Sequence, residues 1–538
     1  MSVLFILPVS LILIEAIRTP EGDLTFHYIA EVLTDPYSWR IAWFTFLQAL
    51  LSTLFALLLG FPGAYLLSHY EFKGKRFVQS IAQLPFVLPS ILVVLGFVIF
   101  FGNSGVLNSL LKHLLDLKET PLKILYSFKA IILAHTFYNF PISLSIIAAF
   151  WQQLDSREES AAMTLGANHR TAFRTITLPR LIPAISAAAS MIFLFCFTSF
   201  SIILVLGGGP KFTTLEVQIY QLARVQFDVS QAAAFALYSL AISSGVLILY
   251  IKSQHWMQKT MGSVGRALSP KRTGRFSKFL IMTYMLLIML LIVAPLLSIL
   301  FRSFQEPISR SGENRVSLRW YLELFGFGSA SQFFKGASQA ILTSISIATV
   351  VTLLSVPISL SLSTLILQLK KRLSIAAETL FMLPMAVSSV IIGLGYAIIV
   401  SRFPVTKIAY PMIIGAHLVI ATPFMIRSVL PVFRKIHKIY TPAALVLGAT
   451  PFQAFLHIQL PLLKMSIISG AIFVFAISIG EMNATLLLSD AKVTTIPILL
   501  YRLIGSYNFF GACALGTLLM SICLILFAAT NSIQERKI

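Results

Sequence analysis

The sequence predicts an all-α integral membrane protein with about twelve transmembrane helices in two homologous six-helix halves. Of its 538 residues, 57% are hydrophobic and only 11% are charged, whereas soluble domains contain about 45–50% apolar and about 25% charged residues. Apolar runs of about 20 residues, the length of a bilayer-spanning helix, recur along the whole chain. We expect helices, because a closed barrel would show alternating segments of about ten residues. An internal repeat then divides the chain into two.

Twelve segments have the length and composition of a membrane span. The first segment is short, lacks a preceding Lys or Arg and has no convincing small-residue cleavage site, so we interpret it as a short span rather than a secretory signal. The predicted spans lie near residues 2–17, 41–67, 78–102, 128–152, 184–208, 231–251, 279–301, 337–368, 374–401, 410–433, 466–488 and 508–530.

The basic residues predict the orientation, because Lys and Arg accumulate in cytoplasmic loops. With the N-terminus inside, the cytoplasmic segments hold 24 of the 41 Lys and Arg but 5 of the 20 Asp and Glu. Both termini are then cytoplasmic, and the basic face lies against anionic lipid of the bilayer. The net charge of +21 therefore follows from topology and requires no nucleic acid partner.

Several classes of site are absent from the sequence. Its three cysteines fall inside predicted spans, and its nine histidines show no metal-binding spacing, so we expect neither a disulfide framework nor a metal site. No GxxxxGK[ST] phosphate-binding motif occurs. We therefore expect no cofactor and no ATPase site in this chain, which makes it a transport subunit rather than an enzyme.

The internal repeat is clearest in two polar segments. "SAAMTLGANHRTAFRTITLP" begins at Ser160 and "PAALVLGATPFQAFLHIQLP" begins at Pro442, and they align at an offset of 282 residues. "LPFVLPSILVVLGF" from Leu84 also matches "LPMAVSSVIIGLGY" from Leu383. Because each half has an even number of spans, both insert in the same sense. The predicted organisation is a first half over 1–251, a cytoplasmic linker over 252–278 and a second half over 279–538.

Each repeated segment reads as two short helices broken at a glycine. In the first segment, Ala161, Ala162 and Leu165 provide a small apolar face, and Gly166 tolerates the positive φ of a helix end. Leu178 and Pro179 then begin the next helix. A short helix of this kind can dock into a groove of a soluble partner. The alternative is a loop that only closes the helical bundle.

The two segments resemble the EAA loop of the permease subunits of binding-protein-dependent ABC importers. In that family the loop forms a coupling helix that inserts into a cleft of the ATPase subunit. Both loops depart from the motif at its acidic first position, where they have Ser160 and Pro442; Glu158 and Glu159 lie close enough to substitute in the first loop. The positions that match the motif are Ala161, Ala162, Gly166, Ala167, Leu178 and Pro179, and Ala443, Ala444, Gly448, Ala449, Leu460 and Pro461.

The presence of both halves in one chain is similar to the arrangement of the thiamine and ferric-iron permeases. The stretch Phe193–Leu222 looks like the thiamine branch, whereas "GEMNATLLL" from Gly480 to Leu488 resembles the iron branch at least as well. The resemblance implies a type I importer permease in the bacterial inner membrane. Its implied partners are two copies of an ABC ATPase subunit and a periplasmic solute-binding protein.

Two polar residues in the eleventh span are candidates for the translocation path. Ionisable groups within spans are costly and are by default functional candidates. Glu481 lies beside Asn483, and its carboxylate would suit a cationic substrate such as a thiazolium; the alternative is a hydrogen bond between helices. His135 and His417 occupy equivalent repeat positions, which favours a shared packing role with hydrogen bonds across the bundle.

One rival function belongs to another class, that of an ion-coupled secondary transporter. Such a carrier requires titratable groups deep in several helices, and the sequence offers one convincing candidate, Glu481. The duplicated loop favours the ATP-driven importer, with thiamine or its phosphates as the expected solute and ferric iron as the alternative.

Overall fold

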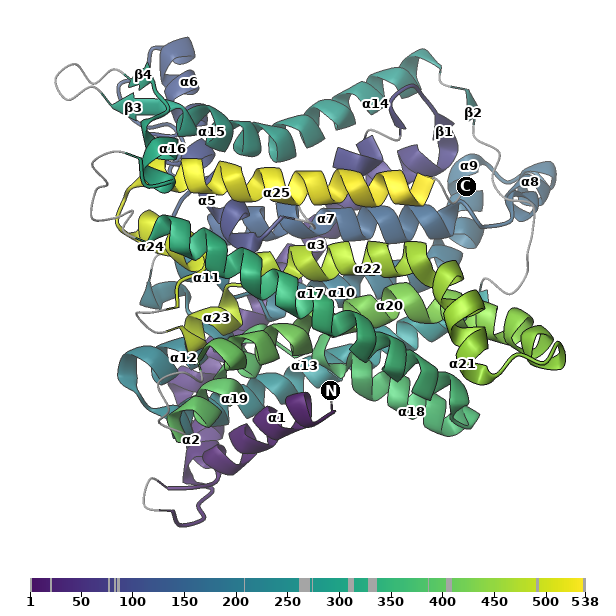
Figure 1. Ribbon diagram of the computed structural model, residues 1–538. Helices are drawn as coiled ribbons and strands as arrows, with labels where there is room; N and C mark the ends of the chain where they lie inside the picture. Colours follow the sequence, from purple (N-terminus) through teal and green to yellow (C-terminus); the bar gives the residue numbers. More distant parts are fainter. Residues whose placement is uncertain are drawn as a thin grey trace. The chain divides into compact units, whose positions relative to one another are not determined.

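The computed structural model is almost entirely helical (Figure 1). It describes residues 2–19, 22–75, 78–81, 84, 88–207, 209–260, 271–272, 274–307, 314–327, 336–385, 387–402, 409–489 and 493–535. The helices form two compact units. The N-half unit consists of Leu33–Val217 and Tyr238–Leu300, and the C-half unit consists of Met1–Val32, Gln218–Leu237 and Phe301–Ile538.

The predicted spans correspond to helices. Within the described ranges, ten helices are long and apolar enough to cross a membrane, or eleven if the bent pair of α18 (Lys371–Met382) and α19 (Ser389–Arg402) is one span. The first predicted span corresponds to the shorter apolar helix α1 (Ser2–Ala16). Of the span predicted over 78–102, the structure describes α5 (Ser90–Phe101), and several of the preceding residues lie outside the described ranges.

The first half of the chain contains helices α1 to α13. Some of them are joined by short helical turns of other types. π-Helical turns lie at Phe173–Thr177 and Leu222–Gln226, and a 3-10 turn lies at Pro210–Phe212. The remaining helices are α2 (His27–Thr34), α3 (Pro36–His69), α6 (Val106–Leu115), α7 (Phe128–Trp151), α8 (Ser156–Thr164), α9 (His169–Ala172), α10 (Leu178–Phe197), α11 (Ser201–Leu206), α12 (Leu215–Gln221) and α13 (Val229–Thr260).

The second half follows the same plan. It has π-helical turns at Met289–Val293 and Phe455–Gln459 and a 3-10 turn at Leu383–Met385. Besides α18 and α19, its helices are α14 (Arg275–Ile288), α15 (Ala294–Ser303), α16 (Arg319–Leu324), α17 (Ala337–Gln368), α20 (Ala409–Val446), α21 (Pro451–Ala454), α22 (Leu460–Gly480), α23 (Asn483–Leu488), α24 (Ile496–Gly505) and α25 (Phe509–Glu535).

Two small strand pairs were not expected from the sequence. β1 (Tyr70–Glu71) pairs in parallel with β2 (Lys271–Arg272), and β3 (Gln305–Pro307) pairs antiparallel with β4 (Asn314–Val316). Each pair is only two or three residues long and sits at helix ends, so the all-helical fold class stands.

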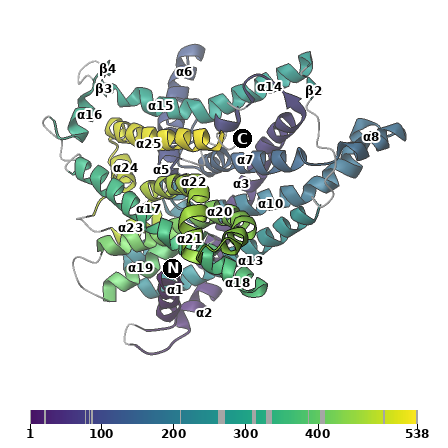
Figure 2. The ribbon, with the colours of Figure 1, turned by 45° about the vertical axis from the view of Figure 1, so that its right-hand side comes forward.

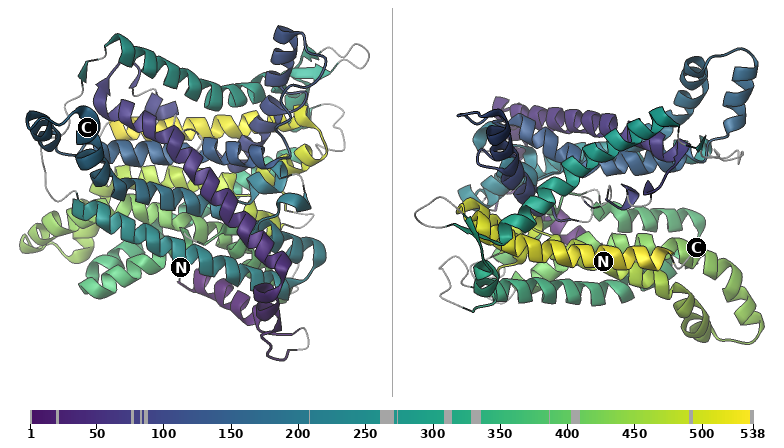
Figure 3. Two further views of the ribbon diagram at one scale, coloured as in Figure 1. Left: turned by 180° about the vertical axis from the view of Figure 1, so that it is seen from behind. Right: turned by 90° about the horizontal axis from the view of Figure 1, so that it is seen from above.

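Capping residues explain where several of the long helices begin. The Asp35 carboxylate accepts a hydrogen bond from the Ser38 N–H at 2.9 Å, and Pro36 follows in the first turn of α3, where its missing N–H costs no bond. The Ser127 hydroxyl accepts from the Ala130 N–H at 3.3 Å at the start of α7. In the view from behind in Figure 3, α3 is the long purple diagonal helix.

Two helices pack in the unit of the opposite repeat. α1 packs against α19 in the C-half unit, where Pro8 contacts the backbone of Gly395 so closely that a Cβ there would lie 2.7 Å from the proline. In the N-half unit, Pro295 of α15 lies against Gly96 of α5 in the matching way. The compact units therefore differ in composition from the halves predicted by the repeat, and those halves remain a prediction about the sequence.

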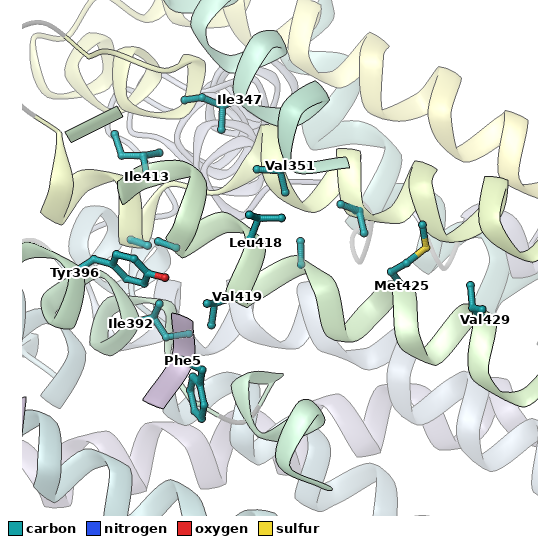
Figure 4. Packing of buried hydrophobic residues seen from close by; sticks show 14 of the residues in the cluster. Phe5, Ile347, Val351, Ile392, Tyr396, Ile413, Leu418, Val419, Met425 and Val429 are labelled. Carbon is teal, nitrogen blue, oxygen red and sulfur yellow. The ribbon is translucent and has the colours of Figure 1, made fainter. Parts of the chain in front are cut away.

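The core of the C-half unit is apolar and includes the N-terminal helix. Phe5 of α1 and Ile392 of α19 belong to one buried cluster with Leu418 and Val419 of α20 (Figure 4). The Tyr396 hydroxyl donates to a carbonyl of α1, that of Leu4, at 2.9 Å. This packing fixes α20, which carries the second repeated loop, within its unit.

Candidate functional site: two repeated loops and two broken helices

The first loop turns at the end of α8 through a Schellman motif, the hydrogen-bonded cap that needs a left-handed residue. Gly166 adopts φ +93°. Its N–H donates to the Met163 carbonyl, and the N–H of Ala167 donates to the Ala162 carbonyl, each at 3.0 Å. Figure 2 shows α8 projecting past the end of α7. The glycine is therefore required by backbone conformation, because a Cβ at this position would meet nothing within 4 Å.

The second loop has the same cap at the matching positions. Gly448 adopts φ +90°, its N–H donates to the Leu445 carbonyl at 3.0 Å, and the Ala449 N–H donates to the Ala444 carbonyl at 3.1 Å. The first helix of this loop is not separate, as the sequence suggested; it is the end of the 38-residue α20. The yellow-green end of α20 projects from its unit in Figure 3.

A leucine stands at each apex and is almost fully exposed. Leu165 is 89% exposed and Leu447 is 87% exposed. Their N–H groups donate to the carbonyls of Ala161 at 3.1 Å and Ala443 at 3.2 Å. The backbone hydrogen bonds of the motif alanines and glycine thus place an exposed leucine side chain at equivalent positions of the two loops.

The motif ends in the same local irregularity in both loops. A five-residue π-helical turn, closed by the N–H of the motif leucine, precedes the motif proline. A proline in a continuing helix clashes with the carbonyl four residues earlier, and a wider turn relieves such crowding. The residues involved are Leu178 and Pro179 at the start of α10, and Leu460 and Pro461 at the start of α22.

Each loop is closed by a side-chain hydrogen bond that was not predicted from the sequence. Thr177 donates to the Glu159 carboxylate at 3.3 Å in the first loop, and Gln459 donates to the Thr441 hydroxyl at 2.7 Å in the second. These pairs occupy equivalent positions at the offset of 282. Between the two halves, both the donor and the acceptor residue differ. This paired difference is the sequence signal that could have identified the two hydrogen bonds.

The first loop has an additional ion pair. Arg180 of α10 contacts Glu158 of α8 at 2.5 Å, with both side chains more than a third exposed. By their sequence positions, Glu158 and Glu159 are the candidates to substitute for the missing acid of the motif. In the structure both carboxylates bind residues at the far end of their own loop, which braces α8 against α10.

The candidate path residues lie at a break between two helices rather than within one span. α22 ends at Gly480, and the Glu481 carboxylate accepts from the Ala484 N–H in the first turn of α23 at 3.0 Å. Asn483 donates to the Ser389 hydroxyl of α19 at 2.9 Å. Both side chains thus have partners within the C-half unit, and their role in a path stays a prediction.

Each half has such a broken helix, and a buried histidine of a neighbouring helix binds hydroxyl groups at or beside each break. His135 contacts the hydroxyls of Ser52 at 3.3 Å and Ser199 at 2.8 Å. His417 contacts the hydroxyls of Ser478 at 2.9 Å and Thr485 at 2.8 Å. The expected hydrogen bonds across the bundle are confirmed for both histidines.

Comparison with known families identifies the class of protein. The family described as "Binding-protein-dependent transport system inner membrane component" matches residues 43–259 and 355–538, which include both loops and both broken helices. The chain therefore belongs to this family. It is a multi-pass inner membrane permease subunit of a binding-protein-dependent ABC importer and has no catalytic role of its own. Membership implies that it works with an ATPase and a solute-binding protein.

Individual relatives cover nearly the whole chain. A "Thiamine transport system permease protein ThiP" of Brucella abortus (strain 2308) is 27% identical over 516 residues, which are 94% of this chain and 89% of the relative. The protein of that name in Escherichia coli (strain K12) is 25% identical over 94% of this chain and 91% of its own length. A "Putative 2-aminoethylphosphonate transport system permease protein PhnU" of Salmonella typhi is 28% identical over 46% of this chain and 86% of its own length.

Among solved structures, a chain of a bacterial ABC transporter involved in the import of the acidic polysaccharide alginate is similar to part of this protein. The match has a TM-score of 0.39 and 18% sequence identity, and covers 48% of this chain and 91% of that chain.

Proposed function

We propose that this permease imports thiamine or its phosphate esters. The support is the set of relatives named thiamine transport permeases, which are 25–27% identical over 93–94% of the chain. The runner-up substrate is ferric iron, which rests on the likeness of the segment from Gly480 to Leu488 to iron permeases. An ion-coupled carrier, the rival considered from the sequence, is not consistent with membership of the importer family.

We further propose that the two loops are the docking sites of two ATPase copies. The observation that supports this proposal is the pair of apex leucines, Leu165 and Leu447, which are 89% and 87% exposed at equivalent positions. Burying a leucine from water contributes about 1.5–3 kcal/mol, so a groove on a partner would gain from covering each apex. The Schellman caps hold both side chains in place before binding, which lowers the entropic cost of docking.

In the proposed cycle the loops pass the motion of the ATPases to the membrane helices. The first loop continues through Leu178 and Pro179 into α10, and the second through Leu460 and Pro461 into α22. Closure of the ATPase dimer on ATP would open the path toward the binding protein, and hydrolysis would reset it. The loops must bind the open and closed dimers with different affinity, because equal affinity shifts no equilibrium. This cycle requires the orientation predicted from the Lys and Arg distribution, in which both termini and both loops are cytoplasmic.

Docking is tested by co-purification of the ATPase with the permease. We expect Leu165→Asp and Leu447→Asp each to weaken retention of the ATPase and the double variant to abolish it. Leu24→Asp is the control, since Leu24 is also an exposed leucine, at 80%, but lies outside both loops. Full retention of the ATPase by the double variant would refute the docking proposal.

The substrate is tested separately, in proteoliposomes that contain the complete importer. We expect the binding protein loaded with thiamine or a thiamine phosphate to stimulate both ATP hydrolysis and uptake, and ferric iron to stimulate neither. Stimulation by iron alone would overturn the substrate and leave the docking proposal intact.

A further inference from the structure

The broken helix of the first half is surrounded by polar side chains that are fully buried. Gln48 of α3 is 0% exposed and donates through Nε2 to the carbonyls of Cys196 at 2.8 Å and Thr45 at 3.1 Å. Asn139 of α7 is 1% exposed and donates through Nδ2 to the His135 carbonyl at 3.0 Å and the Cys196 sulfur at 3.4 Å. Two amide side chains from different helices thus converge on Cys196, next to the break between α10 and α11.

Each of these amides has an acceptor oxygen to which no described residue donates a hydrogen bond. Gln48 Oε1 and Asn139 Oδ1 are buried and have no hydrogen-bond partner in the described part of the chain. The orientation of both amides is fixed, because each nitrogen faces backbone carbonyls, which can only accept. Buried acceptors rarely lack a hydrogen-bond donor in native proteins.

In the second half, the two positions that correspond to Gln48 and Asn139 carry apolar residues. Thr45 and Ser344 accept from the N–H groups of Leu215 and Ile496 at 3.0 and 2.8 Å, and these matching contacts align α3 with α17 at an offset of 299 residues. At that offset Gln48 corresponds to Ile347.

Asn139 corresponds to Ala421 at the offset of 282 between α7 and α20. Ile347 and Ala421 are at most 1% exposed and belong to the apolar cluster of the C-half unit, in which Figure 4 labels Ile347. Both ring nitrogens of His417 have hydroxyl partners. Thr214 Oγ1 and its equivalent Thr495 Oγ1 lack a partner among the described residues in both halves, so the two junctions differ in the amide oxygens of Gln48 and Asn139.

We propose that internal water binds at the junction of the first half, beside Gln48, Asn139 and Cys196, and that Ile347 and Ala421 exclude water from the equivalent positions of the second half. A water molecule carries the two donors that two amide oxygens require, and buried waters typically join polar groups that protein atoms leave unpaired. Among the described contacts of Gln48 and Asn139 there is no carboxylate, so these neutral acceptors suit a neutral donor better than a cation.

X-ray radiolytic footprinting in H₂¹⁸O tests the site on the unmodified protein, because hydroxyl radicals form where water is bound. The chain supplies its own control: Cys196 and Cys523 are both 0% exposed free thiols, and Cys523 lies in α25. We expect Cys196 to gain ¹⁸O several-fold faster than Cys523. Equal rates of oxidation would overturn the proposal without any variant.

A variant that copies the second half sharpens the test. Gln48→Ile with Asn139→Ala removes both open acceptors and is expected to lower Cys196 oxidation to the rate of Cys523. An unchanged rate in this variant would count against the assigned site, and if the variant does not accumulate, the wild-type rates decide alone. A Cys196 rate that depends on replacing Na⁺ by choline would assign the site to a cation and reject water as its occupant.

Discussion

The two repeated loops present the same apex on different supports. In the first half, α7 ends at Trp151 and α8 starts again at Ser156. In the second half, α20 runs without a break from Ala409 to Val446 and carries the apex at its end. The glycine caps and the exposed leucines are nevertheless alike. Apex geometry is thus set by a few local residues, whereas the stiffness of its support depends on the helix behind it.

One capping residue accounts for much of the difference in support. Asp155 accepts from the Arg157 N–H at 3.0 Å and starts α8 as a new helix. The equivalent residue of the second half is His437, and the helix continues through it. The ion pairs of the two supports also differ: Glu158 of α8 contacts Arg180 within the same loop, whereas Arg434 of α20 contacts Glu378 of α18.

The largest expected effect comes from breaking what the loops share. We predict that Gly166→Pro or Gly448→Pro abolishes uptake by vesicles while the protein still inserts into the membrane. Proline cannot adopt positive φ, so the cap is lost; alanine costs about 1–2 kcal/mol in that region, and asparagine less. Gly505→Ala is the control, since that glycine has open space and no positive φ. Normal uptake by both proline variants would disprove the shared role of the apex.

The next largest effect concerns Glu481, which lies at the break of the helix in the second half. We predict that Glu481→Ala destabilises the C-half unit by about 1–3 kcal/mol, because the buried Ala484 N–H at the start of α23 loses its acceptor. Glu481→Gln keeps an acceptor for the Ala484 N–H and should retain both the thermal unfolding midpoint and transport. Loss of uptake in a stable Glu481→Gln variant would instead assign the carboxylate to the path of a cationic substrate.

Exchanging the closing bonds tests whether the loops are interchangeable. We predict that Thr177→Val costs about 0.5–1.5 kcal/mol through the lost hydrogen bond. The double variant Glu159→Thr with Thr177→Gln, which copies Thr441 and Gln459, should recover most of that loss. Thermal unfolding in detergent measures both effects. A double variant less stable than Thr177→Val would mean that each pair depends on its own loop.

The smallest effect concerns the contact found only in the first loop. We predict that Arg180→Leu, which introduces the residue found at the equivalent position Leu462, changes stability by no more than about 1 kcal/mol, as exposed ion pairs do. The difference from wild type should disappear at high salt. A larger, salt-independent loss would show that Arg180 supports the loop by packing.

Local rules predicted most of the fold and the outline of the loops. The apolar runs identified the spans, and the repeat located Gly166, Gly448 and the motif prolines. The breaks at Ser199 and Glu481 were not predicted, because apolar residues continue on both sides of each break over the length of a single span. The bond between Glu159 and Thr177 was also missed, since residues 18 positions apart meet only after the chain reverses.

The sequence by itself determined that the chain crosses the membrane many times, that it is duplicated, and that it carries two glycine-capped turns. These properties depend on hydropathy and on backbone preferences within a few residues. The tertiary structure alone decided that α1 and α15 pack against helices of the opposite repeat, and that Gln48 and Asn139 converge on Cys196. Those contacts join residues more than fifty positions apart, and close packing between helices selects them.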